Sequence, residues 1–134
     1  MRIVLIVLLW MVAAPAAAEW VRVGKPSRSF PFLSSEAAYY IDPSTIDKDG
    51  NFRRVWQIHD LSEKGAQGER SVLESVEYDC AAKRMRVIKA TGKSQRMARG
   101  EIIPLRAAFD DWIILQPGKE NEKIFEILDT VCAP

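Results

Sequence analysis

Residues 71–91 read SVLESVEYDCAAKRMRVIKAT and predict two strands joined by a tight connection. From Val72 to Cys80 every second residue is apolar or aromatic except Glu74, and the alternate positions are polar except Leu73. Such alternation is typical of a strand with one buried face. Residues 84–91 are apolar enough for a partner strand, so we expect an antiparallel hairpin whose turn follows Cys80.

The beginning of the chain has the organisation of a secretory signal peptide. Arg2 supplies a positive charge, residues 3–12 are apolar, and small residues precede Glu19. An apolar stretch of this length is too short to span a bilayer. We therefore expect residues 1–18 to be cleaved and 19–134 to form a single exported domain, periplasmic or secreted. No cysteine lies near the cleavage site, so we expect no lipid anchor and no transmembrane anchor.

Removal of Arg2 with the signal leaves equal numbers of basic and acidic residues, and the domain is formally neutral. Neutrality and export argue against nucleic acid as a partner.

The two cysteines of the chain, Cys80 and Cys132, allow a single pairing. In an exported domain that pairing is expected to be a disulfide, which would tie the central hairpin to the end of the chain. Two free thiols or a pair of metal ligands are the alternative.

Further strands are expected on both sides of the hairpin, and the segments between them are rich in Gly, Pro, Ser and charged residues. The expected strands are Glu19–Val23, Tyr39–Ile41, Asn51–Asp60 and Glu101–Ile103, and residues 105–115 are expected to form an irregular lid or a short strand. Residues 62–70 should be a mobile connection. Asp47, Asp49 and Gly50 imitate part of a calcium loop, but its first and last ligand positions hold Thr45 and Trp56, so a turn is the better interpretation.

The last element is expected to be an amphipathic helix. Ile124, Ile127, Leu128, Val131 and Cys132 follow the spacing of one helical face, which places Cys132 on the buried side. The expected fold class is α+β, with an antiparallel sheet of about five to six strands and this C-terminal helix packed across one face and tied by the disulfide.

The order of these signals resembles the surface-adhesin protein E family over nearly all of the exported domain. The resemblance is carried by Trp20, Tyr40 to Pro43, the Asp49-Gly50 turn, Arg54 to Trp56, Glu77 to Cys80 with Arg84, Met97, Gly100-Glu101, Trp112, Pro117-Gly118 and Cys132. It implies a small antiparallel sheet with a disulfide-tied helix, and the member that named the family looks like a protein that binds host extracellular-matrix and serum proteins. The founding member resembles a lipoprotein, and this chain lacks the lipidation cysteine.

A run of basic residues without an intervening acidic one supplies the candidate binding residues. They are Lys83, Arg84, Arg86, Lys89, Lys93, Arg96 and Arg99. A run of one sign attracts anionic partners such as a glycan, lipid phosphates or an acidic protein surface. The alternative is solvation together with pairing to the acidic C-terminal segment, which contains Asp110, Asp111, Glu120, Glu122, Glu126 and Asp129. By strand parity Arg84 and Arg86 share one face and Lys89 lies on the other.

Two other function classes remain open. An enzyme would need His59, the single histidine, to act on a serine brought near it, but the sequence has no G-x-S-x-G, H-E-x-x-H or phosphate-binding loop, and no cofactor or metal site is expected. A structural or assembly role would use self-association as a homodimer, with Leu73, Met85 and Val87 as apolar material. The expected function is an exported, non-enzymatic binding module for host matrix proteins or anionic ligands.

Overall fold

The computed structural model describes residues 18–27, 36–106, 111–116, 118 and 122–134. The expected signal peptide lies almost entirely outside these residues, as do Asp110 and Glu120. The elements are β1 (Val21–Arg22), β2 (Ala37–Ile41), the 3-10 helix η1 (Pro43–Thr45), β3 (Asp47–Asp49), β4 (Phe52–Leu61), β5 (Ser71–Asp79), β6 (Arg84–Lys93), β7 (Ile102–Ile103), β8 (Ile113–Ile114) and α1 (Glu122–Cys132).

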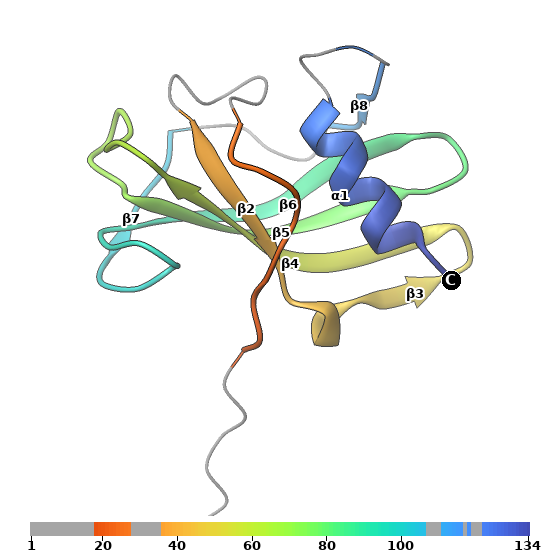
Figure 1. Ribbon diagram of the computed structural model, residues 1–134, viewed down its shortest axis with the longest axis horizontal. Coiled ribbons are helices and arrows are strands. Elements are labelled where there is room, and N and C mark those ends of the chain that lie inside the picture. Colours follow the sequence, from red (N-terminus) through yellow and green to blue (C-terminus); the bar gives the residue numbers. More distant parts are fainter. Residues whose placement is uncertain (1–17, 28–35, 107–110, 117, 119–121) are drawn as a thin grey trace, which may run out of the picture.

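All the strands belong to one antiparallel sheet with α1 lying across it, which confirms the α+β class (Figure 1). The strand order is β1-β2-β4-β5-β6-β7, with β3 also paired to β4 and β8 to β6. The sheet has eight strands rather than the expected five to six. The difference comes from β3 and β8, which are three and two residues long, because β1 and β7 lie within the expected strands Glu19–Val23 and Glu101–Ile103. A segment that short has no alternation to detect.

The expected hairpin of residues 71–91 is confirmed as β5 and β6, and the turn between them places Lys83 at φ +53°. Gly50 is at φ +57° in the turn between β3 and β4, which agrees with the interpretation of Asp49-Gly50 as a turn. Residues 62–70, expected to be a mobile connection, contain a hydrogen-bonded turn. The Gly65 N–H donates to the Glu69 carbonyl at 2.8 Å, and the Gln67 N–H donates to the Glu69 carboxylate at 2.9 Å.

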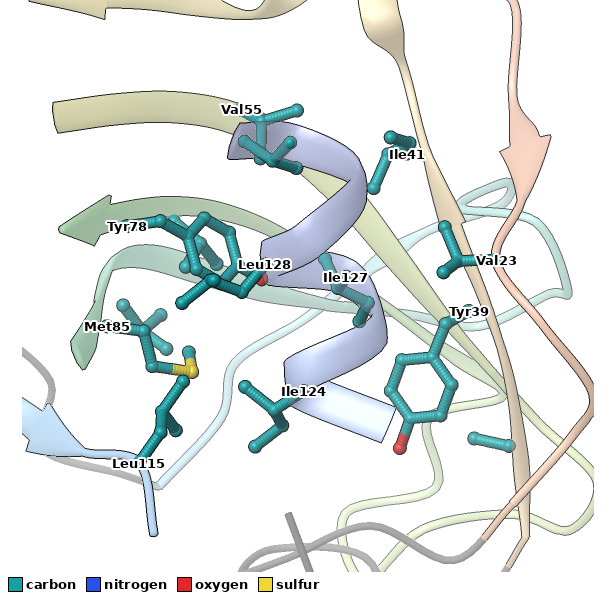
Figure 2. Close-up of a cluster of buried hydrophobic side chains, with 14 of the residues drawn as sticks. Val23, Tyr39, Ile41, Val55, Tyr78, Met85, Leu115, Ile124, Ile127 and Leu128 are labelled. Atoms are coloured by element: carbon teal, nitrogen blue, oxygen red, sulfur yellow. The ribbon is translucent and has the colours of Figure 1, made fainter. Parts of the chain in front are cut away.

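The core lies between α1 and one face of the sheet (Figure 2). Ile124, Ile127, Leu128 and Val131 are buried, as the helical spacing predicted. They pack in one cluster with residues from the central strands, including Val55, Val76, Tyr78, Met85 and Val87. A fully buried side chain of this size is worth about 1.5–3 kcal/mol of transfer free energy, so this cluster is the main force that docks the helix.

The disulfide between Cys80 and Cys132 is present, with the two Cα atoms 5.8 Å apart. Cys80 directly follows β5, and Cys132 is the last residue of α1. The bond therefore joins the end of the helix to the end of the central strand.

The strand pairings assign each side chain to a face, because residues in register on neighbouring strands point to the same side. One set of rows faces α1 and includes Val55–Val76–Val87 and Gln57–Glu74–Ala90. The opposite side, which we call the outer face, contains the rows Phe52–Asp79–Arg84, Arg54–Glu77–Arg86, Trp56–Ser75–Lys89, Ile58–Leu73–Thr91 and Asp60–Ser71–Lys93.

Strand β5 was expected to bury one face, but it is buried on both. Val76 and Tyr78 lie in the helix-side core as predicted, and Ser71, Ser75 and Asp79 on the outer face are also buried. These polar side chains are small or hydrogen-bonded, and neighbouring long side chains and a loop cover them.

Candidate functional site

The bulge in β6 decides which basic residues gather on the outer face. Val76 pairs with Val87, but the preceding Ser75 pairs with Lys89, so Ile88 is an extra residue on β6. A bulge of this kind reverses the face of every later residue on its strand. Lys89 therefore lies on the same face as Arg84 and Arg86, and the expectation that it lies on the other face is wrong.

The outer face thus has a row of cationic side chains along β6. Arg84, Arg86, Lys89 and Lys93 are all in register with outer-face residues of β5. Lys89 is exposed and Lys93 is half-buried, and within the described residues neither makes an ion pair. We call Arg84, Arg86, Lys89 and Lys93 the cationic row.

The arginines at one end of the row are held by neighbouring carboxylates. Arg84 Nε lies 2.9 Å from Asp79 Oδ2, and Arg86 Nη2 lies 2.7 Å from Glu77 Oε1. Glu77 also accepts from Arg54 on β4 at 3.2 Å. Hydrogen bonds from the Ala82 N–H and Arg84 lower the pKa of Asp79 against the opposing effect of burial. The Asp79 carboxylate is therefore held in its ionised form beside Arg84.

The indole ring of Trp112 stacks on the guanidinium groups of the same two arginines. The guanidinium carbon of Arg84 is 4.2 Å from the indole centroid, and that of Arg86 is 4.7 Å away. Phe52 contacts Trp112 with ring centroids 6.0 Å apart. Each cation–π contact is worth about 0.5–2 kcal/mol, so the guanidinium groups have few orientations open to them.

A loop closes the other end of the outer face. Asp60, which is buried, accepts from the Met97 N–H at 2.9 Å, and its second oxygen lies 2.8 Å from Arg96 Nη2. The Ser71 hydroxyl donates to the Gln95 carbonyl at 2.6 Å and accepts from the Ala98 N–H at 2.9 Å. The Arg96 guanidinium is thereby held over the outer face at Asp60 on β4, in the cross-strand row that contains Lys93 on β6.

The two remaining candidates lie at turns. Lys83 is exposed in the turn between β5 and β6, and Arg99 is exposed in the loop after Met97 and Ala98, which adopt φ values of +57° and +56°. The structure does not place Arg99 in register with the cationic row.

The expected pairing of the basic run with the acidic C-terminal segment is not what the described residues show. Arg84, Arg86 and Arg96 pair with Asp79, Glu77 and Asp60, all of which lie on the sheet. Of the acidic residues named for that role, Glu126 pairs instead with Lys123 on its own helix at 2.6 Å. Cross-strand register brings the sheet carboxylates closer than any helix residue.

Two of the apolar residues expected to support self-association are in the core. Met85 and Val87 are buried beneath α1, because their parity on β6 is that of Tyr78 and Val76. Leu73 alone of the three lies on the outer face, where it is half-buried.

His59 does not pair with the adjacent Asp60, because the two side chains lie on opposite faces of β4. His59 Nε2 lies 2.6 Å from Glu74 Oε1, and its ring contacts Tyr39 edge-on at 4.7 Å. Glu74 also accepts from Gln57 Nε2, and the Gln57 carbonyl accepts from the Tyr78 hydroxyl at 2.7 Å. This buried network satisfies polar groups on the helix side of the sheet.

The Glu74 carboxylate makes the stability of the fold depend on pH in the acid range. Burial alone would raise its pKa, but the charge of His59 and the hydrogen bonds from His59 and Gln57 outweigh burial and lower the pKa from the ordinary 4.5. A pKa lower in the folded than in the unfolded state adds stability above about pH 4.5, which is lost as the pH falls through the folded pKa.

We therefore expect Glu74→Gln to flatten the acid end of the stability profile. Urea unfolding of both proteins at a series of pH values would show a smaller decrease below pH 4.5 for the variant than for the parent, since glutamine does not titrate. Parallel profiles would show that Glu74 is not the titrating group.

Sequence reasoning missed the aromatic part of the outer face and the β4 arginine. Phe52, Trp56 and Arg54 were identified as strand residues, and Trp112 as part of an irregular lid, with no link to the basic run. The alternation of Phe52, Trp56 and Ile58 was the available signal, because it marks a second apolar face that α1 does not cover.

Two other kinds of site are absent from the described residues. No group of three or more His, Cys, Asp or Glu side chains in the described ranges could hold a metal ion. Among the helices of those ranges, none is long and apolar enough to cross a membrane.

The fold is similar to that of Haemophilus influenzae protein E. Its selenomethionine form superposes with a TM-score of 0.61 at 14% identity, covering 90% of this chain and 92% of that one. A second structure of the same protein gives 0.58 at 15% identity, with 90% of each chain covered. Identities this low show the shared fold alone.

At the level of sequence, a search of curated proteins finds no match. The family model described as Surface-adhesin protein E, however, matches residues 20–133, which is nearly the whole of the chain after the expected signal peptide. The chain therefore belongs to the surface-adhesin protein E family.

Proposed function

We propose that this protein is an exported, non-enzymatic, adhesin-like module that binds host extracellular-matrix proteins or other anionic ligands through its outer face. Membership of a surface-adhesin family implies export and supports an adhesin-like role. The observation that carries the choice of face is the β6 bulge, which aligns Arg84, Arg86, Lys89 and Lys93 on one side of the sheet.

The outer face has properties that favour binding over simple solvation. Its arginines are fixed by carboxylates and by Trp112, so little side-chain freedom is lost when a partner binds. Lys89 is exposed beside them and attracts anionic groups over a longer range. The opposite face is covered by α1 and, among the described residues, has no comparable cationic row.

Self-association is a second candidate, favoured by apolar side chains on short edge strands. Ile102 on β7 and Ile114 on β8 are each 67% exposed. Large exposed apolar side chains at a sheet edge are common where a second copy pairs. Sedimentation at several concentrations would give a constant monomer mass if these residues do not support assembly.

The first test is binding of the purified, oxidised protein to immobilised extracellular-matrix proteins. Lys89→Glu/Lys93→Glu is expected to reduce saturable binding by roughly tenfold or more, because two attractive charges become repulsive. The matched control is Lys48→Glu/Lys64→Glu, which changes the same charge on β3 and in the loop 62–70.

Equal binding by the two double variants would show that the outer face is not the contact surface. No saturable binding by the parent protein to any member of the panel would overturn the matrix-adhesin proposal.

A further inference from the structure

We infer that the outer face binds one chain of a sulfated polysaccharide, laid along β6. This inference rests on the proposed function, since it names the ligand class of the same face. Three properties of the cationic row support it: its length, its narrow width and the chemistry of its donors.

The row is long enough for an extended chain. Strand β6 has ten residues, and at about 3.3 Å per residue it spans about 30 Å. Outer-face side chains recur at every second residue on each side of the bulge, and three positions separate Arg86 from Lys89. Arg96, held by Asp60 on β4, lies to one side of this line, in the cross-strand row that contains Lys93. Sulfate groups repeated along a polysaccharide can meet such a series one after another.

The row is also narrow. The neighbouring strand β5 places Glu77 and Asp79 in register with Arg86 and Arg84, and the serines Ser75 and Ser71 in register with Lys89 and Lys93, so the positive charge does not extend onto β5. A planar anionic membrane would also lie over β5, where Glu77 and Asp79 offset the charges of Arg86 and Arg84 and the serines add none. A single polyanionic chain can follow the cations alone, which favours a polysaccharide over a lipid surface.

The donors suit sulfate. Arg84 uses Nε for Asp79, and its two Nη atoms have no hydrogen-bond partner in the part of the chain that the structure describes. The planar end of a guanidinium group matches two oxygens of a tetrahedral anion, and the stacking on Trp112 holds that plane in place. Lys89 adds a mobile point charge.

Calorimetric titration of the oxidised protein with heparin oligosaccharides of increasing length tests the inference. We expect affinity to rise with length until the chain spans the row and then to level off, and to fall steeply with added salt. Lys89→Gln/Lys93→Gln should weaken binding by roughly tenfold, and Lys48→Gln/Lys64→Gln should leave it unchanged. Arg84→Lys, which keeps the charge, should weaken binding because the planar fork is lost.

Two comparison ligands distinguish binding of a sulfated chain from binding of carboxylates or of a lipid surface. Hyaluronan, which carries carboxylates without sulfates, should bind much more weakly, and so should vesicles containing phosphatidylserine. Binding to vesicles that matches or exceeds binding to heparin would overturn the inference in favour of a lipid surface. A loss of heparin affinity that is equal in the two lysine variants would also overturn it.

A failure of the polysaccharide inference can be distinguished from a failure of the proposed function. Matrix-protein binding that depends on Lys89 and Lys93, without any heparin binding, would retain the proposed face and reject the polysaccharide. Absence of both kinds of binding would reject both.

Discussion

Replacing both Cys80 and Cys132 with alanine is expected to lower the free energy of unfolding by about 4 kcal/mol. The bond closes a loop with a sequence separation of 52 residues, and cross-linking a loop of that size restricts the unfolded chain strongly in the loop-entropy model. It also holds the end of α1 against the end of β5, where the helix would otherwise begin to detach. Since small domains are stable by about 5–15 kcal/mol, the variant should unfold at a much lower urea concentration.

The comparison has an internal control. A reducing agent should destabilise the parent protein by a similar amount and leave the double variant unchanged. A loss below about 1 kcal/mol would show that core packing of α1 is sufficient without the bond.

His59→Leu is expected to cost roughly 3 kcal/mol, because it removes one partner of a buried carboxylate. Glu74 is 5% exposed and is held by His59 and Gln57. Leaving a buried charge with fewer partners costs more than the partner itself contributed. Urea unfolding at neutral pH would measure the loss, with retention of the native fold checked by circular dichroism.

A second variant tests whether the stability lost in His59→Leu comes from an unpaired buried charge or from lost packing. His59→Leu/Glu74→Gln removes the carboxylate charge but keeps an oxygen that can accept from Gln57. It should recover part of the stability that His59→Leu loses. If the two substitutions are strictly additive, the buried pair is not the source of the effect.

The main elements of the fold could be predicted from the sequence because each contains a full period of its pattern. The ten-residue strand β4, the hairpin of β5 and β6, and the eleven-residue helix were all recognised in this way. The cysteines gave the helix its attachment point, because only one pairing was available. Strands β1 and β7 lie within the expected segments Glu19–Val23 and Glu101–Ile103, but β3 and β8 have only three and two residues, and their pairing is determined by neighbouring strands rather than by their own sequence.

The arrangement of the outer face could not be predicted, for a specific reason. Parity assigned Lys89 to the face opposite Arg84 and Arg86, and a single extra residue, Ile88, reverses that assignment. Nothing in the sequence around Ile88 marks a bulge, since β-branched residues are common throughout ordinary strands. The stacking of Arg84 and Arg86 on Trp112 also depends on a contact between segments far apart in the chain.

Lysine acetylation followed by mass spectrometry, with and without a saturating ligand found in the binding tests, measures the contact surface on the unaltered protein. Our account predicts that the ligand slows acetylation of Lys89 and Lys93 on the outer face, and that Lys48 and Lys64 react at the same rate in both states. Protection of Lys48 and Lys64 with unchanged reactivity at Lys89 and Lys93 would contradict the central claim that the outer face is the binding surface.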